Sequence, residues 1–154
     1  MKIDKIFIIN LEERVDRKNE MIKEMDKAGI TNYEFFKAIR PTCQEDIDKW
    51  NPNFVKKRPE WLKTDLQKYR LGSLGCLLSH IGVMELSLQR NYNRIMIIED
   101  DVSFIRFVKD GKFEETLEVI SKQIGSNKVD ILYIGGNHNP NRLRQVDKNI
   151  YRTF

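Results

Sequence analysis

Three consecutive carboxylates, Glu99, Asp100 and Asp101, are the residues of this sequence best suited to chemistry. They follow an apolar run, residues 95–98, that is typical of a short buried strand. Ligands of open α/β sheets bind beyond the carboxyl ends of the strands. A hard divalent cation such as Mg²⁺ or Mn²⁺ would relieve the repulsion between adjacent carboxylates there and could bridge to a diphosphate. A solvated acidic turn is the plain alternative, and spacing alone does not separate the two.

Receiver domains of two-component signalling also place an acidic pair after an apolar strand. Their chemistry needs a phospho-accepting aspartate at the end of a later strand, but the later apolar run, residues 131–134, is followed by Gly135. Asp130 precedes that run, at the wrong end of the sheet. The acidic cluster of a receiver is also expected after the first strand, whereas here it follows the third. The sequence therefore disfavours a receiver domain.

The segment from Asn10 to Arg17 is a second candidate, because it leaves the first predicted strand and enters a helix. Helix N-termini attract anions through their free N–H groups and the helix dipole. Arg14 and Arg17 lie one turn apart and would add positive charge to a phosphate site. An ordinary charged first turn, in which acidic residues such as Asp16 suit the dipole and pair with the arginines, explains the stretch more simply when it is taken alone.

A third stretch, residues 72–80, contains Gly72-x-x-Gly75 and ends at His80. A single glycine pair of this kind is weak evidence for a site. It fits a loop that enters a helix with its backbone pressed close to a neighbour. We expect His80 to be a hydrogen-bonded structural histidine and Cys76 to be a small buried packing residue.

The hydrophobic periodicity predicts an α/β chain that opens with a strand, a helix and a strand. Strands are expected over 3–9, 33–38, 94–98 and 129–134, and helices over 12–28, 43–50, 72–90 and 113–124. The apolar stripe of the third helix is expected to be Leu74, Leu77, Leu78, Ile81, Met84 and Leu88. Residues 1–136 are expected to form one domain with an irregular excursion at 40–72, followed by an irregular tail at 137–154.

The composition indicates a soluble, globular protein. The 154 residues include 32% charged and 40% hydrophobic side chains, and 27 basic against 23 acidic residues give a net charge of +4. This length is typical of one domain, and charges of both signs are interspersed, which does not favour nucleic-acid binding. The sequence has no apolar run near 18 residues and no recognisable secretory signal, so we expect no transmembrane segment and a cytoplasmic location. Cys43 and Cys76 are then expected to be free thiols.

Four motifs taken together resemble glycosyltransferase family 25, which includes bacterial lipooligosaccharide galactosyltransferases and collagen galactosyltransferase-like domains. The motifs are Ile6-Phe7-Ile8-Ile9-Asn10-Leu11 with Arg14 and Arg17, then Phe36-Lys37-Ala38, then residues 72–80, and then Ile97-Ile98-Glu99-Asp100-Asp101-Val102. Each motif is modest alone, but they occur in the family's order over most of residues 3–136. The resemblance implies a GT-A-like fold: a single α/β domain with a Rossmann-type, mostly parallel sheet flanked by helices.

The resemblance also implies a function. Family members transfer a hexose, typically galactose or glucose, from a UDP-sugar to a glycan, lipooligosaccharide or glycoprotein acceptor, with inversion and with Mn²⁺ or Mg²⁺. The metal site that it implies has Asp101 as direct ligand, with Glu99 at the ribose or at a metal-bound water. The nucleotide-sugar site that it implies comprises Asn10, Leu11, Arg14, Glu99 and Asp100.

The chain departs from the family pattern after Ile134, because family members continue well beyond this point whereas about 20 residues follow it here. Inversion needs a general base to deprotonate the acceptor hydroxyl. His138 is a candidate base or metal ligand, although a surface-loop histidine is the simpler interpretation, and Asp147 is the carboxylate of the tail. We expect either a shortened hexosyltransferase or a shortened, non-catalytic nucleotide-binding or assembly module. A phosphate-handling Mg²⁺ protein of another α/β family is a third alternative.

Overall fold

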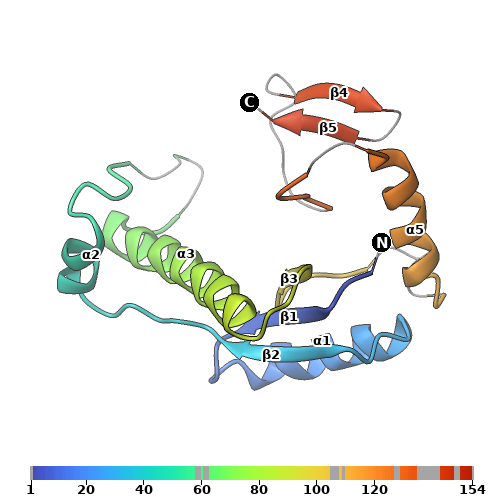
Figure 1. Cartoon of the computed structure of the whole chain (residues 1–154). Coiled ribbons are helices and arrows are strands. Elements are labelled where there is room, and N and C mark those ends of the chain that lie inside the picture. Colours follow the sequence, from blue (N-terminus) through green and yellow to red (C-terminus); the bar gives the residue numbers. More distant parts are fainter. Residues whose placement is uncertain are drawn as a thin grey trace.

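A sheet of three parallel strands is the centre of the computed structural model (Figure 1). In their order across the sheet, the strands are β2 (Tyr33–Lys37), β1 (Lys5–Asn10) and β3 (Ile95–Glu99). Asn10 is paired with Lys37, and Ile9 is paired with Glu99. All three strands therefore end along one edge of the sheet, which is the edge where open α/β folds bind their ligands.

Four helices accompany the sheet in the part of the chain that the structure describes. They are α1 (Val15–Lys27), α2 (Gln44–Trp50), α3 (Leu66–Gln89) and α5 (Phe113–Ile124). The structure describes residues 2–57, 60, 63–104, 108, 110–126, 129–134, 143–147 and 150–153. The expected class, an α/β domain with a parallel sheet flanked by helices, is confirmed.

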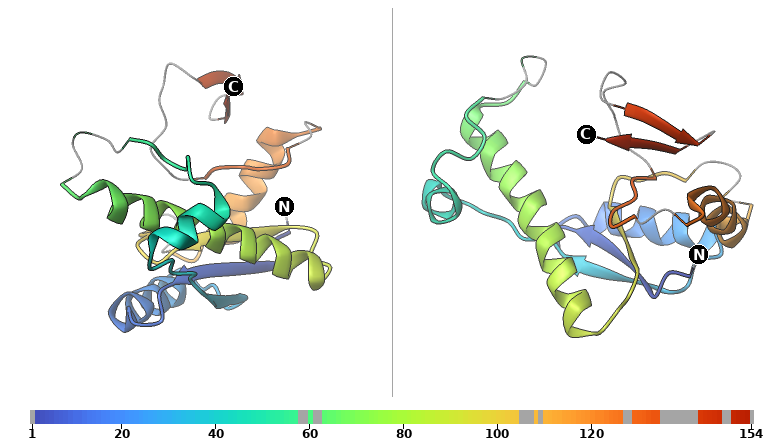
Figure 2. Two further views of the ribbon diagram at one scale, coloured as in Figure 1. Left: turned by 90° about the vertical axis from the view of Figure 1, so that its left-hand side faces the viewer. Right: turned by 45° about the horizontal axis from the view of Figure 1, so that its top comes forward.

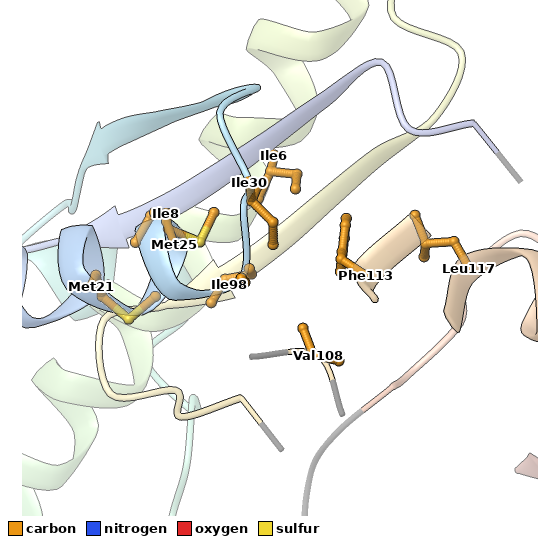
Figure 3. Packing of buried hydrophobic residues seen from close by; sticks show 10 residues of the cluster. Ile6, Ile8, Met21, Met25, Ile30, Ile98, Val108, Phe113 and Leu117 are labelled. Atoms are coloured by element: carbon orange, nitrogen blue, oxygen red, sulfur yellow. The ribbon is translucent and has the colours of Figure 1, made fainter. Parts of the chain in front are cut away.

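One face of the sheet is covered by α1 and α5. Alternate residues of β1 point to this face, as the two-residue period of a strand requires, and they meet apolar side chains of both helices (Figure 3). The buried residues of this cluster are Ile6, Ile8, Met21, Met25, Ala28, Ile30, Ile98, Val108, Phe113 and Leu117. Gly29, at φ 67°, follows α1 in the left-handed conformation that commonly ends a helix.

Helix α3 covers the opposite face, where Phe7 and Ile9 of β1 pack against Val83. The backbone after β2 runs very close to this helix. A Cβ atom on Gly75 would lie 2.8 Å from the Ile39 carbonyl oxygen, so a side chain there would displace backbone. The Ser79 hydroxyl accepts a hydrogen bond from the Ile39 N–H at 2.8 Å. The expectation that glycine allows a close backbone approach is confirmed at Gly75.

The predicted bounds and buried face of α3 are wrong in two respects. The helix begins at Leu66, within the supposed irregular excursion at 40–72, where Asp65 caps it by accepting from the Lys68 N–H at 2.7 Å. Its buried residues are Leu74, Gly75, Ser79, Val83 and Ser87, whereas Met84 and Leu88 of the expected stripe are exposed. Because the chain after β2 lies so close to α3, only small residues fit on this part of the helix surface. A prediction based on large apolar side chains therefore does not identify the buried face.

Helix α3 also bears on the expectation that the chain has no transmembrane segment. Among the described residues, it is the one helix long and apolar enough to cross a membrane by length and composition. The core helix of a water-soluble protein passes the same test, and α3 packs against the sheet. Length and composition of a single helix are therefore weak evidence for a membrane span.

The segment after α5 also differs from the prediction. Residues 129–134, expected to be a fourth strand, are not in a strand, and Ile131 and Tyr133 are 65% and 66% exposed. An apolar run signals strand propensity, but a strand also needs a partner edge. The supposedly irregular tail instead contains the antiparallel pair β4 (Leu143–Asp147) and β5 (Ile150–Thr153), which lies apart from the central sheet (Figure 2).

Two glycine substitutions test the packing of α3. Gly75→Ala should lower the free energy of unfolding by about 1–3 kcal/mol, because the new methyl group meets the Ile39 carbonyl oxygen. Gly72→Ala is the matched control, since no atom lies within 4 Å of its Cβ position and alanine favours a helix by about 1 kcal/mol. Urea denaturation of both variants measures the difference. Equal stability of the two variants would contradict the close approach.

Candidate functional site

The candidate site begins with a contact between the ends of two neighbouring strands. Asn10, the last residue of β1, is buried, and its Nδ2 donates a hydrogen bond of 2.7 Å to Oδ2 of Asp100, directly after β3. The same amide group donates to the Arg14 carbonyl oxygen at 3.2 Å. One side chain thus joins the end of β3 to the turn that leads into α1.

Arg17 on α1 completes the environment of Asp100. Its Nη1 lies 2.8 Å from Oδ1 of Asp100 and 3.6 Å from Oδ2 of Asp101. Each Asp100 oxygen therefore has a partner, and the side chain is only 12% exposed. Asp101 is 61% exposed. Asp100 serves to hold the loop in place, whereas Asp101 offers its carboxylate to solvent.

Glu99 turns to the other face of the sheet, toward α3. The Cys76 thiol donates to Oε1 of Glu99 at 3.6 Å, and Nε2 of His80 lies 3.9 Å from the same oxygen. The three consecutive carboxylates thus point to different partners: Glu99 faces α3, Asp100 faces Asn10, and both Asp100 and Asp101 face Arg17. Glu99 is the last residue of β3 and follows the alternation of side chains along the strand, whereas Asp100 and Asp101 lie in the turn after it and both turn toward α1.

Cys76 and His80 differ from their predicted roles. Cys76 is exposed, so the expectation of a buried packing residue is wrong, and Cys43 is exposed as well. Partial burial, reinforced by the negative charge of Glu99 and its hydrogen bond, raises the pKa of the Cys76 thiol. His80 is hydrogen-bonded as expected, because its Nδ1 donates to the Cys76 carbonyl oxygen at 3.0 Å. Its other ring nitrogen faces Glu99.

Leu11 and Arg14 form the turn between β1 and α1. The Arg14 N–H donates to the Leu11 carbonyl oxygen at 2.8 Å, and the Arg14 guanidinium pairs with Asp16 at 2.7 Å. The hydrogen bonds from Arg14 lower the pKa of Asp16 to about 2. The alternative of a charged first turn is therefore observed for Arg14, whereas Arg17 reaches the acidic loop. A phosphate contact by Arg14 stays a prediction.

Two sets of side chains could hold a metal ion. Glu99 and Asp101 are exposed carboxylates that flank Asp100 and supply the oxygen donors that Mg²⁺ or Mn²⁺ prefers. Cys76, His80 and Glu99 form a group of three whose ligand atoms all lie within 4.8 Å of one another. Asp101 does not belong to that group. The predicted pair Glu99 and Asp101 is thus divided between the two faces of the sheet.

A wide, shallow hollow of about 540 Å³ lies along α3 and the residues before it, and it reaches this edge of the sheet at Cys76. It is lined by Thr64, Lys68, Tyr69, Gly72, Ser73 and Cys76.

The candidate base His138 lies outside the described residues. Sequence reasoning missed the meeting of Cys76 and His80 with Glu99, although their four-residue spacing on a predicted helix is the signal for a shared face.

Comparison with known proteins assigns this chain to a family. A family model described as glycosyltransferase family 25 (LPS biosynthesis protein) matches residues 3–153, nearly the whole chain. The chain belongs to glycosyltransferase family 25. The resemblance inferred from the four sequence motifs is confirmed.

Three relatives illustrate the range of the family. A glycosyltransferase 25 family member from Aedes aegypti is 29% identical over 136 residues, which cover 88% of this chain and 21% of the relative. Procollagen galactosyltransferase 2 of Mus musculus is 27% identical over 140 residues, which cover 88% of this chain and 21% of the relative. A Homo sapiens protein named inactive glycosyltransferase 25 family member 3 is 26% identical over an alignment of 157 positions, which covers 94% of this chain and 24% of the relative. The chain spans about a fifth to a quarter of the length of these relatives.

Loss of the Asn10 amide tests the junction between the strands. Asn10→Ala should lower the free energy of unfolding by about 1.5–3 kcal/mol, because a nearly buried carboxylate loses a hydrogen-bond donor. Chemical denaturation measures the loss. Asp16→Ala is the control, since it breaks an exposed ion pair of α1 and should lower the free energy of unfolding by no more than about 1 kcal/mol. Equal stability of the two variants would contradict the role of Asn10.

Thiol alkylation tests the contact between Glu99 and Cys76. In a Cys43→Ser background, Cys76 is the sole cysteine, and its alkylation follows the population of the thiolate. Glu99→Gln removes the negative charge that opposes ionisation, so the midpoint of the rate against pH should move to lower pH. Iodoacetamide labelling followed by mass spectrometry gives the rates. A midpoint that stays in place would show that Glu99 does not act on this thiol.

Proposed function

We propose that this chain is the nucleotide-sugar-binding part of a hexosyltransferase. The donor is a UDP-hexose, with galactose or glucose as the sugar, and the acceptor is a glycan, a lipooligosaccharide or a glycoprotein. The reaction inverts the anomeric centre and depends on Mn²⁺ or Mg²⁺. Family membership supports sugar transfer, and the similarity to the mouse relative procollagen galactosyltransferase 2 supports galactose.

The observation that carries this proposal is the hydrogen bond from Asn10 to Asp100. It joins the end of β1 to the loop after β3, and both lie at the carboxyl edge of a parallel sheet. Three sequence motifs of the resemblance thereby meet in space, because Arg17 of the first motif also pairs with Asp100 and Glu99 of the last contacts Cys76 of the third. A sheet edge of this type suits a nucleotide.

Each residue has a role in the proposed site. Asp101 is the direct ligand of the metal ion, which when bound would stabilise the negative charge that develops on the departing diphosphate. Glu99, which faces α3, contacts the ribose or a metal-bound water. Asn10, Leu11 and Arg14 bind the nucleoside and its phosphates, and Asp100 keeps the acidic loop in register with them. Arg17 pairs with Asp100 and Asp101 and partly compensates their charge before the donor binds.

Binding of UDP tests the proposed function. Calorimetric titration of UDP into the 154-residue chain should give binding with Mn²⁺ present and none in EDTA. Asp101→Asn should weaken the Mn²⁺-dependent binding by about 10-fold or more, since it removes a metal-ligating carboxylate. Asp26→Asn, an exposed residue near the end of α1, removes the same charge elsewhere and should bind normally. Unchanged binding by Asp101→Asn, or equal binding of other nucleotides, would overturn the assignment.

A non-catalytic nucleotide-binding or assembly module is the second candidate. It is favoured by the similarity to the human protein named inactive glycosyltransferase 25 family member 3, of which this chain matches 24%. Such a module would bind UDP through the same residues but release no UDP from a UDP-sugar. Turnover of UDP-galactose or UDP-glucose by the purified chain therefore separates the two candidates.

A further inference from the structure

We propose that Cys76, His80 and Glu99 form a second metal site that binds Zn²⁺ rather than Mn²⁺ or Mg²⁺. Two of the three ligands come from α3 and the third from the end of β3. A sulfur atom, an imidazole nitrogen and a carboxylate oxygen are the three donor types that Zn²⁺ takes in proteins. Mg²⁺ and Mn²⁺ favour oxygen donors, so the thiolate selects against the metal proposed for sugar transfer.

The orientation of His80 is that of a metal ligand. A carbonyl oxygen can only accept, so the contact of 3.0 Å from Nδ1 to the Cys76 carbonyl places the ring proton on Nδ1. In the neutral imidazole, Nε2 then carries a lone pair, and it faces the Glu99 carboxylate at 3.9 Å, which is too long for a hydrogen bond. Two electron-rich atoms face each other across a gap that a cation would fill. Metal-ligating histidines characteristically donate their second N–H to such a carbonyl.

The separations between the donor atoms suit a tetrahedral ion. With Zn–S near 2.3 Å and Zn–N and Zn–O near 2.0–2.1 Å, tetrahedral angles put the sulfur about 3.6 Å from the oxygen and the nitrogen about 3.4 Å from it. The observed distances to Oε1 of Glu99 are 3.6 Å from the Cys76 sulfur and 3.9 Å from Nε2 of His80. The three ligand atoms lie within 4.8 Å of one another, so rotations of these side chains would bring them to the separations of a bound ion.

The scaffold of the site is firm and its entrance is open. Cys76 and His80 are four residues apart and share one face of α3, the spacing at which paired ligands on a helix hold one metal ion. On the buried side of the same turns, Gly75 and Ser79 press against the chain after β2. Cys76 is exposed and lines the hollow of about 540 Å³. A fourth coordination position therefore remains for water or a ligand from that hollow.

Binding Zn²⁺ converts the Cys76 thiol to a thiolate and releases its proton to solvent. The inference does not rest on the proposed function, because Cys76 and His80 have no part in the UDP site. Both sites use Glu99, so Zn²⁺ and the Mn²⁺–UDP complex should compete for that carboxylate.

Titration with Co²⁺, a coloured substitute for Zn²⁺, tests the proposal on the reduced 154-residue chain. We expect one Co²⁺ per chain, with a thiolate charge-transfer band and intense visible bands of tetrahedral geometry, both abolished by one equivalent of Zn²⁺. Wild-type chain that lacks the thiolate band with Co²⁺ would overturn the proposal without any variant.

Matched variants identify the ligands. Cys76→Ser and His80→Gln should each weaken Zn²⁺ binding by well over about 10-fold, the cost of losing even a supporting contact around a metal. Cys43→Ser removes the other cysteine and should bind Zn²⁺ normally. Circular dichroism of each variant establishes that it is folded. Equal losses in Cys76→Ser and Cys43→Ser would refute the site.

The proposed zinc site and the proposed Mn²⁺–UDP site can be refuted independently of each other. If Asp101→Asn loses Mn²⁺-dependent UDP binding but keeps the Co²⁺ spectrum, the zinc site stands on its own. If wild-type chain binds UDP with Mn²⁺ but gives no thiolate band with Co²⁺, the zinc site is refuted and the proposed function is untouched.

Discussion

The nearly buried carboxylate of Asp100 is the group on which the arrangement of this sheet edge depends. A charge removed from water is costly unless it is paired and hydrogen-bonded. Asn10 and Arg17 supply those partners, one to each oxygen. Because Asn10 ends β1 and Arg17 lies on α1, satisfying this carboxylate fixes the loop after β3 against both elements. Of the side chains on either side of Asp100, Glu99 contacts α3 and Asp101 lies near Arg17 of α1.

Close packing of α3 determines what Glu99 meets. Gly75 and Ser79 let the helix lie against the backbone after β2, at a distance that larger side chains would prevent. That approach brings Cys76 and His80, on the other side of the same turns, to the end of β3. The glycine and serine of the third motif are therefore packing residues, and the cysteine and histidine beside them are available for chemistry.

The acidic triplet consequently serves three purposes. Asp100 holds the loop, Asp101 offers an exposed carboxylate on the side of α1, and Glu99 approaches a thiol and an imidazole on the side of α3. Oxygen donors suit the metal proposed for UDP-sugar transfer, whereas the sulfur and nitrogen donors suit a borderline metal such as Zn²⁺. Family membership accounts for the motifs, and the division of the carboxylates suggests how one edge could hold two different cations.

The sequence by itself determined the local elements. The continuous apolar run of β1, the charged periodicity of α1 and the bounds of α5 follow from burial patterns within a few residues. It also placed Asn10 and the acidic triplet at strand ends, and parallel pairing brings such ends together. Only the tertiary structure decided that Arg17 rather than Arg14 contacts Asp100, that small residues form the buried face of α3, and that Glu99 faces Cys76. These contacts join residues 23 to 90 positions apart. The hydrophobic period of a helix or strand indicates which of its faces is buried, but it does not indicate which distant side chain lies against that face.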